Sequence, residues 1–271
     1  MPKKYSLHKF SLCFLFVLAT LAANSPIYHT GFFSLILCGA ISLVLIFLLS
    51  ILLNVGQKNK TVFYITTCCV TLAAALGAVT GFLDFFTFLK TVLLPQSSDI
   101  LLFVALVLLV LFFLKTPVDA LFKYSLFTAL ICALIIALCF ISGIKTFDFN
   151  ALNTALTPDF KFDTALYFLP IIVLPFFIKC EAGNTKPMFL GTGAGVAGVL
   201  LCSLQSILIL GADNDITFPY LKAVGVISSG SLFTRLDGLV YFLFFVTTII
   251  RITVCIKAIA KIVFQKGVKV Q

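Results

Sequence analysis

Charged residues are scarce in this sequence, and acidic ones most of all. Asp, Glu, Lys and Arg together make up 11% of its 271 residues, with 10 acidic residues against 19 basic ones. A soluble globular protein carries roughly 25% charged residues, whereas here 61% of the residues are hydrophobic and the mean hydropathy is +1.19. The shortage of charge excludes an ordinary water-soluble domain and predicts an all-α polytopic membrane protein.

Histidine is almost absent, since His8 and His29 are the only two. They flank the first apolar run and would lie at opposite faces of a membrane, which leaves no histidine for a Ser/His/Asp arrangement. The acidic residues lie almost wholly between the apolar runs, and no pair is placed in one run for general acid–base work. We therefore expect no enzyme and no catalytic residue.

Paired cysteines are missing as well. Nine cysteines are present, but none forms a Cys-x-x-Cys pair, and all except Cys180 lie inside apolar runs. A free thiol in such a run behaves as a small hydrophobic side chain. An odd number of cysteines with two histidines favours neither a disulfide framework nor a metal site, so we expect no metal and no cofactor.

A glycine cluster at Gly191, Gly193, Gly195 and Gly198 superficially resembles a phosphate-binding loop. No strand precedes it and no Lys-Ser or Lys-Thr follows it, so close helix packing through Gly191 and Gly195 is the better interpretation. The net charge of +9 does not indicate a nucleic-acid partner either. The basic residues fall in short clusters between apolar runs rather than along one face.

Apolar runs recur along the whole chain, and a helix that crosses a bilayer needs ~20 residues. We expect one transmembrane domain, residues 1–271, with eight spans: residues 10–23, 31–53, 61–83, 100–114, 124–144, 165–178, 188–210 and a last one from 238. Asp84 is expected to end the third span, so that residues 85–94 lie at the outer interface or re-enter the membrane. Most basic residues then fall inside, which indicates that both termini are cytoplasmic.

The first run has two interpretations. Lys3, Lys4 and Lys9 precede it, it is short for a span, and it ends in small residues at Ala22 and Ala23. This pattern is typical of a cleaved signal peptide as well as of a retained first helix. The second span begins outside in either case, so the rest of the topology does not depend on the choice.

Two further segments have an unusual composition. Pro170 and Pro175 interrupt the sixth run, which predicts either a broken helix that marks a binding site or a merely kinked one. Gly77 and Gly81 give the third run a small-residue face, which we interpret as ordinary helix packing.

The segment Arg235-Leu236-Asp237 stands before the last apolar run. On a helix its two charges would lie about 200° apart, so they cannot pair with each other and each needs another partner. We interpret both as structural charges near the outer end of the last span, and expect Arg235→Ala to lower the abundance of the protein in the membrane. Arg251 lies deeper in that span, and either extends to the interface or meets an acid on a neighbouring helix.

Several motifs occur together in the C-terminal third. Phe218-Pro219-Tyr220, then Ile-Ser-Ser-Gly-Ser-Leu-Phe at 227–233, then Arg235-Leu236-Asp237 and the following apolar run resemble the B subunit of spore germinant receptors, the endospore germination permease family. Phe-Leu-Asp-Phe at 82–85, Leu-Lys-Thr-Val-Leu-Leu-Pro at 89–95 and Phe-Asp-Phe-Asn-Ala-Leu at 147–152 resemble further segments of the family in the same order.

The resemblance implies a fold similar to amino-acid permeases, with ten helices in two inverted repeats of five and with helices one and six broken around a central ligand site. The first repeat would occupy about 8–144, an external loop 145–164, and an incomplete second repeat about 165–271, because eight spans leave the last two helices of the family without a counterpart. The sequence also departs from the family after Pro170, where Ile171 follows in place of an acidic residue.

The same resemblance implies a function. It indicates a membrane subunit of a nutrient-germinant receptor that binds a small nutrient such as an amino acid, with other receptor subunits as partners, in the spore inner membrane or the cell membrane. The candidate ligand-binding residues are Ala22, Ala23, Asn24, Pro170 and Pro175, and the structural or signature charges are Arg235, Asp237 and Asp84. Two alternatives stay open: an amino-acid secondary transporter and a degenerate scaffold that does not transport.

Overall fold

The structure is a computed structural model that describes residues 2–22, 32–56, 59–151, 164, 167–182, 186–211, 218–230 and 236–265. Throughout these ranges the regular structure is helical, with no strand. The α-helices are α1 (Pro2–Leu18), α2 (Phe32–Gly56), α3 (Lys60–Phe88), α4 (Asp99–Lys115), α5 (Val118–Gly143), α8 (Val173–Ala182), α9 (Lys186–Leu210), α10 (Pro219–Gly230) and α11 (Leu236–Gln265). The all-α part of the predicted fold class is therefore confirmed for the described residues.

Short helical turns of other kinds continue or precede some of these helices. They are the 3-10 turns η1 (Ala19–Ala22), η3 (Ile144–Thr146) and η4 (Leu169–Ile172) and the π-helical turn η2 (Leu89–Leu93). Two of them, η1 and η4, lie in the first and sixth apolar runs, the two in which the family resemblance implies broken helices.

Within the described residues, five helices are long and apolar enough to cross a membrane: Phe32–Leu53, Lys60–Leu93, Val118–Thr146, Lys186–Leu210 and Leu236–Val263. The other three expected spans correspond to shorter elements. The first run forms α1 and η1, the fourth forms the 17-residue α4, and the sixth forms η4 and α8. The apolar parts of the first and sixth elements are Ser6–Leu21 and Leu169–Ile178. A helix rises 1.5 Å per residue, so these parts and the 17-residue α4 are each shorter than the ~30 Å hydrocarbon core.

The third span does not end at Asp84, contrary to the sequence-based expectation. The helix runs on through Asp84 to Phe88 and then through η2 to Leu93. Asp84 is buried inside the bundle, and Phe85 and Phe88 just beyond it are buried as well. Residues 85–94 are therefore largely a continuation of α3 rather than a separate interfacial or re-entrant segment.

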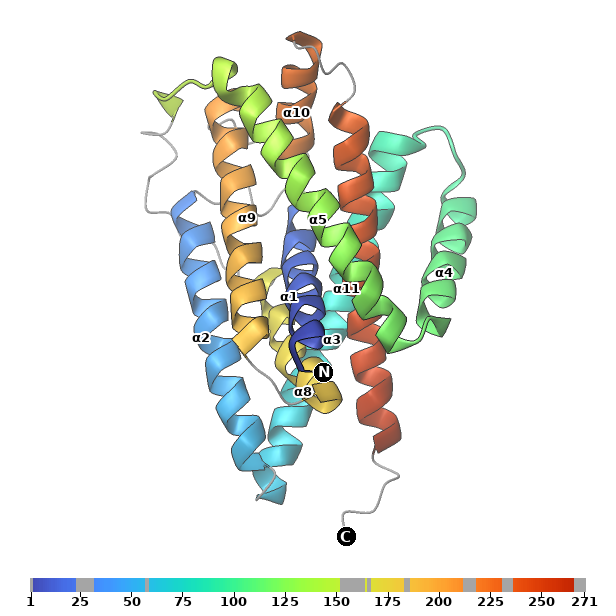
Figure 1. The fold of residues 1–271 in the computed structure, drawn as a ribbon. Helices are drawn as coiled ribbons and strands as arrows, with labels where there is room; N and C mark the ends of the chain where they lie inside the picture. The colour runs from blue at the N-terminus through green and yellow to red at the C-terminus, as the bar shows by residue number, and fades with distance from the viewer. Residues whose placement is uncertain are drawn as a thin grey trace.

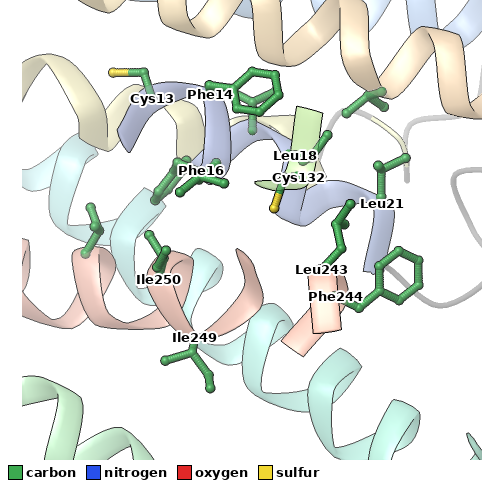
Figure 2. Packing of buried hydrophobic residues seen from close by; sticks show 14 of the residues in the cluster. Cys13, Phe14, Phe16, Leu18, Leu21, Cys132, Leu243, Phe244, Ile249 and Ile250 are labelled. Carbon is green, nitrogen blue, oxygen red and sulfur yellow. The ribbon is translucent and has the colours of Figure 1, made fainter. Parts of the chain in front are cut away.

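The first helix is the most deeply buried element. α1 lies in the middle of the bundle, with α2 and α9 on its left in Figure 1, α11 and α4 on its right, and α5 crossing in front. Every residue from Ser11 to Leu21 is buried. In Figure 2, Phe16 and Leu18 of α1 and Leu21 of η1 extend into the apolar core, with Leu21 on the side of Leu243 and Phe244.

Two glycine faces make the tight contacts that the sequence predicted. A Cβ at Gly195 of α9 would come within 2.7 Å of the Cβ of Val17 on α1, and a Cβ at Gly191 would fall against the backbone of Phe10. On α3, a Cβ at Gly77 would come within 2.6 Å of the Cβ of Pro170. Only glycine allows backbones to approach this closely, so the packing interpretation is confirmed for both clusters.

The sixth run changes helix type at its first proline. Pro170 lies in η4, and α8 then starts at Val173 with Pro175 in its first turn. Proline is tolerated there because the first N–H groups of a helix have no partner within it. Pro175 therefore does not break the helix, and the irregular backbone is confined to η4.

α10 is a helix that the sequence pattern did not predict. It precedes α11 as a separate element of 12 residues, and Tyr220 on it is fully buried. Phe218, just before it, has a φ of 51°, a left-handed conformation that is uncommon outside glycine. The buried Phe218 ring nevertheless packs against those of Phe88 and Phe244.

Candidate functional site

Arg251 is the most unusual side chain in the interior. It lies near the middle of α11, is the one charged residue between positions 238 and 256, and is 2% exposed. A charged group placed in hydrocarbon is costly, so such residues are rare and are held by partners inside the bundle. Arg251 does not extend to the interface, and the second of the two sequence-based interpretations, a partner on a neighbouring helix, describes it better.

Three other segments meet at its guanidinium. Nη2 donates a hydrogen bond to the backbone carbonyl of Tyr167 at 3.1 Å, just before η4. The guanidinium carbon lies 6.0 Å from the centroid of the Phe16 ring of α1, within cation–π range. The carboxyl of Asp84 on α3, itself only 8% exposed, interacts electrostatically with the guanidinium.

Arg251 still has an unused donor. Its Nε–H is buried without a hydrogen-bond partner among the described residues, and the same holds for the hydroxyl of Thr248 on α11. A buried polar group that is left unpaired costs about 1–3 kcal/mol. Thr248 lies three residues before Arg251, and residues at this spacing share one face of a helix. The two unpaired donors therefore occupy the same face of α11.

The irregular segments η1 and η4 pack beside the helices that carry Arg251 and Asp84. η1 packs against α11 and α3, and η4 packs against α3. Pro170, a predicted ligand residue, fits against Gly77 of α3, where a Cβ would also come within 2.9 Å of Cys255 Sγ on α11. The structure thus brings Pro170 and Asp84 to the contact between α3 and α11. Pro175 follows Pro170 in the chain and lies in α8.

The remaining predicted site residues fall in three groups. Ala22 is the last residue of η1, but nothing is described of its side chain. Ala23, Asn24 and Arg235 lie outside the described residues. Asp237 is partly buried in the first turn of α11, where an acidic side chain favourably offsets the positive end of the helix dipole.

A second polar cluster lies between α5, α9 and α10. Gln205 Nε2 donates to the carbonyl oxygen of Cys139 at 2.7 Å, while Gln205 Oε1 has no partner in the described part of the chain. The fully buried Tyr220 hydroxyl has no nitrogen or oxygen partner there, and its polar neighbours are the thiols of Cys139 and Cys202, which are weak hydrogen-bonding groups. These uncharged groups join three helices, which is a packing role.

Metal-binding groups do not gather in the described part of the chain: no three His, Cys, Asp or Glu side chains there are placed to hold an ion. Eight cysteines have described side chains; all eight are free, and six of them are buried. Sulfur in these positions packs like a small apolar group.

Sequence reasoning singled out Arg251 and Asp84 separately but did not connect them. It missed Tyr167, Phe16 and Thr248, because each joins the site through a contact between distant segments or through an unpaired hydroxyl. The one available signal was the spacing of Thr248 and Arg251 within an apolar run. Comparison of the chain with protein-family models, curated proteins and solved structures found no match.

Proposed function

We propose that this chain is the membrane subunit of a spore nutrient-germinant receptor, which binds a small nutrient such as an amino acid inside its helical bundle. The observation that carries the proposal is the position of Arg251, which contacts Phe16 of α1 and the Tyr167 carbonyl before η4. A single buried cation thereby joins α1 to the segment just before η4, and the sequence resemblance assigns the ligand site to these first and sixth spans.

The pairing of helices supports a permease-like arrangement. In two inverted repeats of five spans, the second span corresponds to the seventh and the third to the eighth. The second and seventh spans are α2 and α9, and the third and eighth are α3 and α11. Within each of these pairs the two helices pack against each other. The first and sixth spans, α1 with η1 and η4 with α8, both contact α11 and lie between these pairs.

The distribution of basic residues supports a cytoplasmic location for both ends. The N-terminal end of α1, the junction of α4 with α5 and the C-terminal end of α11 lie in the lower half of Figure 1. Lys115 and Lys123 occur at the α4–α5 junction, and Lys257 near the end of α11 donates a hydrogen bond to the carbonyl of Thr116 there. This end of the bundle is the lysine-rich one that the positive-inside rule places in the cytoplasm.

The 3-10 turns η1 and η4 give a physical reason for a ligand to bind beside them. Irregular backbone in a membrane is tolerated where it is buried in protein or lines a water-filled cavity, and broken helices in transporters carry the substrate there. A receptor that uses the same site would transmit binding through a shift of these segments against α3 and α11.

The proposal is tested by deleting the gene in its native host and measuring the germination of purified spores with each of the twenty standard amino acids, with a sugar mixture and with a high-pressure stimulus. We expect the response to at least one nutrient to be lost, restored by the wild-type gene, and the pressure response to be unchanged. Unaltered germination with every nutrient would reject the receptor function.

The transporter alternative makes a different prediction. The purified chain in liposomes would then accumulate a labelled amino acid along an ion gradient. A receptor subunit is expected to bind the nutrient without this uptake, so concentrative uptake combined with normal germination of deletion spores would replace the proposed function with amino-acid transport.

A further inference from the structure

The unpaired donors on α11 indicate the chemistry of the ligand. Arg251 donates a hydrogen bond from Nη2 to the Tyr167 carbonyl, while its Nε–H and the Thr248 hydroxyl on the same face have no partner among the described residues. Helical side chains lean toward the N-terminus of their helix, so the Arg251 side chain extends over the turn that carries Thr248. Two neighbouring donors of this kind match the two oxygens of a carboxylate.

The balance of buried charge restricts the ligand further. Among the side chains that the structure describes, the buried ones of Asp, Glu, Lys or Arg are those of Lys9, Asp84 and Arg251. Lys9 lies two turns before Phe16 on α1, and Asp84 already offsets the charge of Arg251. A carboxylate alone would add an uncompensated negative charge to a site of low dielectric, which is unfavourable. A ligand that carries its own ammonium group would leave the site neutral.

We propose that Arg251 and Thr248 bind the carboxylate of a small zwitterionic ligand, with the Nε–H and the hydroxyl donating to its two oxygens. The inference rests on the proposed function only for the location of the ligand site. It adds the two residues of α11 that recognise the carboxylate, neither of which belongs to the irregular segments.

The experiment measures ligand-dependent thermal stabilisation of the purified full-length chain in detergent micelles. The probes are the twenty standard amino acids and, for the one with the largest effect, two analogues: its amide, which lacks the carboxylate, and its desamino acid, which lacks the ammonium group. We expect stabilisation by the amino acid and at least a tenfold weaker apparent affinity for either analogue. Equal affinity for the amide would overturn the proposal.

Three variants locate the carboxylate. Thr248→Val keeps the shape of the side chain and removes its hydroxyl, and it should weaken apparent affinity about tenfold, the effect of one good hydrogen bond. Arg251→Lys keeps the charge but removes the Nε–H and the planar group, and should weaken it at least a hundredfold. Thr253→Val is the matched control, because Thr253 is also buried with an unpaired hydroxyl but lies about 200° from Arg251 around the helix.

The outcomes separate this inference from the proposed function. Equal affinity of Thr248→Val and Thr253→Val would overturn the inference even if Arg251→Lys does not fold. No stabilisation by any amino acid, with germination lost in the deletion strain, would reject the inference and leave the receptor function standing. Carboxylate-dependent binding that requires Thr248, with normal germination of deletion spores, would support the inference and reject the receptor function.

Discussion

The guanidinium of Arg251 donates a hydrogen bond to the carbonyl oxygen of Tyr167 at 3.1 Å and so connects α11 to the residues just before η4. The carbonyl is a neutral partner and cannot balance the charge. Asp84 on α3 supplies the opposite charge, so one residue of α11 connects both the sixth segment and the third helix. The stability of the bundle should therefore depend on Arg251 and Asp84 together.

Removing one member of this pair should be costly. Arg251→Met or Asp84→Asn leaves an uncompensated buried charge, and we expect either to lower the free energy of unfolding in micelles by about 3–5 kcal/mol. The double variant should cost less than the sum of the two single ones, since neither charge is then left alone. Denaturant unfolding of the four proteins measures this coupling, and additive effects would show that the two charges do not interact.

Gly77 should not tolerate even one added methyl group. A Cβ there would come within 2.6 Å of the Pro170 Cβ and 2.9 Å of Cys255 Sγ, so Gly77→Ala should lower the free energy of unfolding by about 1–3 kcal/mol. Gly193→Ala is the matched control in another helix, because no atom lies within 4 Å of its added Cβ. The control should be neutral or up to ~1 kcal/mol more stable. Equal stability of the two variants would contradict the tight contact.

The contact between α1 and α9 can be tested with two glycines one turn apart. Gly195→Ala places a Cβ 2.7 Å from the Cβ of Val17, whereas at Gly198 the nearest atom is Leu18 Cδ1 at 3.4 Å, an ordinary contact. We expect Gly195→Ala to reduce the yield of folded protein in the membrane severalfold and Gly198→Ala to leave it unchanged. Fluorescence-detected size-exclusion chromatography of tagged variants provides the measurement. A similar loss for both variants would show that the added methyl group disturbs α9 without regard to its contact with α1.

Tyr220 offers a prediction of the opposite sign. Its hydroxyl is buried with only the weakly hydrogen-bonding thiols of Cys139 and Cys202 beside it among the described residues, so Tyr220→Phe removes a poorly paired polar group while keeping the ring that packs near Phe244. We expect the melting temperature in micelles to stay the same or to rise, by the equivalent of about 1 kcal/mol. Tyr220→Ala should cost about 3–5 kcal/mol as a control for ring packing. A clear loss of stability in Tyr220→Phe would show that the hydroxyl has a partner.

Composition and small-residue spacing were sufficient to predict the class of the protein and two of its tightest contacts. Scarce charge indicated a helical membrane protein, and the glycines at positions 77 and 191 indicated close packing, because both signals depend on local sequence alone. The partner helices were not predictable, since α1 meets α9 and Pro170 meets Gly77 across long stretches of chain.

The charged residues show where such reasoning stops. Asp84 was expected to end a span because an isolated carboxylate is costly in hydrocarbon. The structure places Arg251 where it interacts with Asp84, so the helix continues for another two turns beyond it. A charged residue in an apolar run either ends a membrane span or pairs with an opposite charge inside the bundle, and only tertiary structure distinguishes the two cases.

The central position of α1 also affects how the protein is made. α1 is synthesised before the helices that cover it, of which α5 comes earliest and α9 and α11 considerably later. Until α9 and α11 are inserted, much of the surface of α1 that is buried in the final bundle contacts lipid or the insertion machinery. Assembly therefore includes a step in which later helices close around an earlier one, and the contacts of Arg251 with Phe16 and Tyr167 can form only in that step.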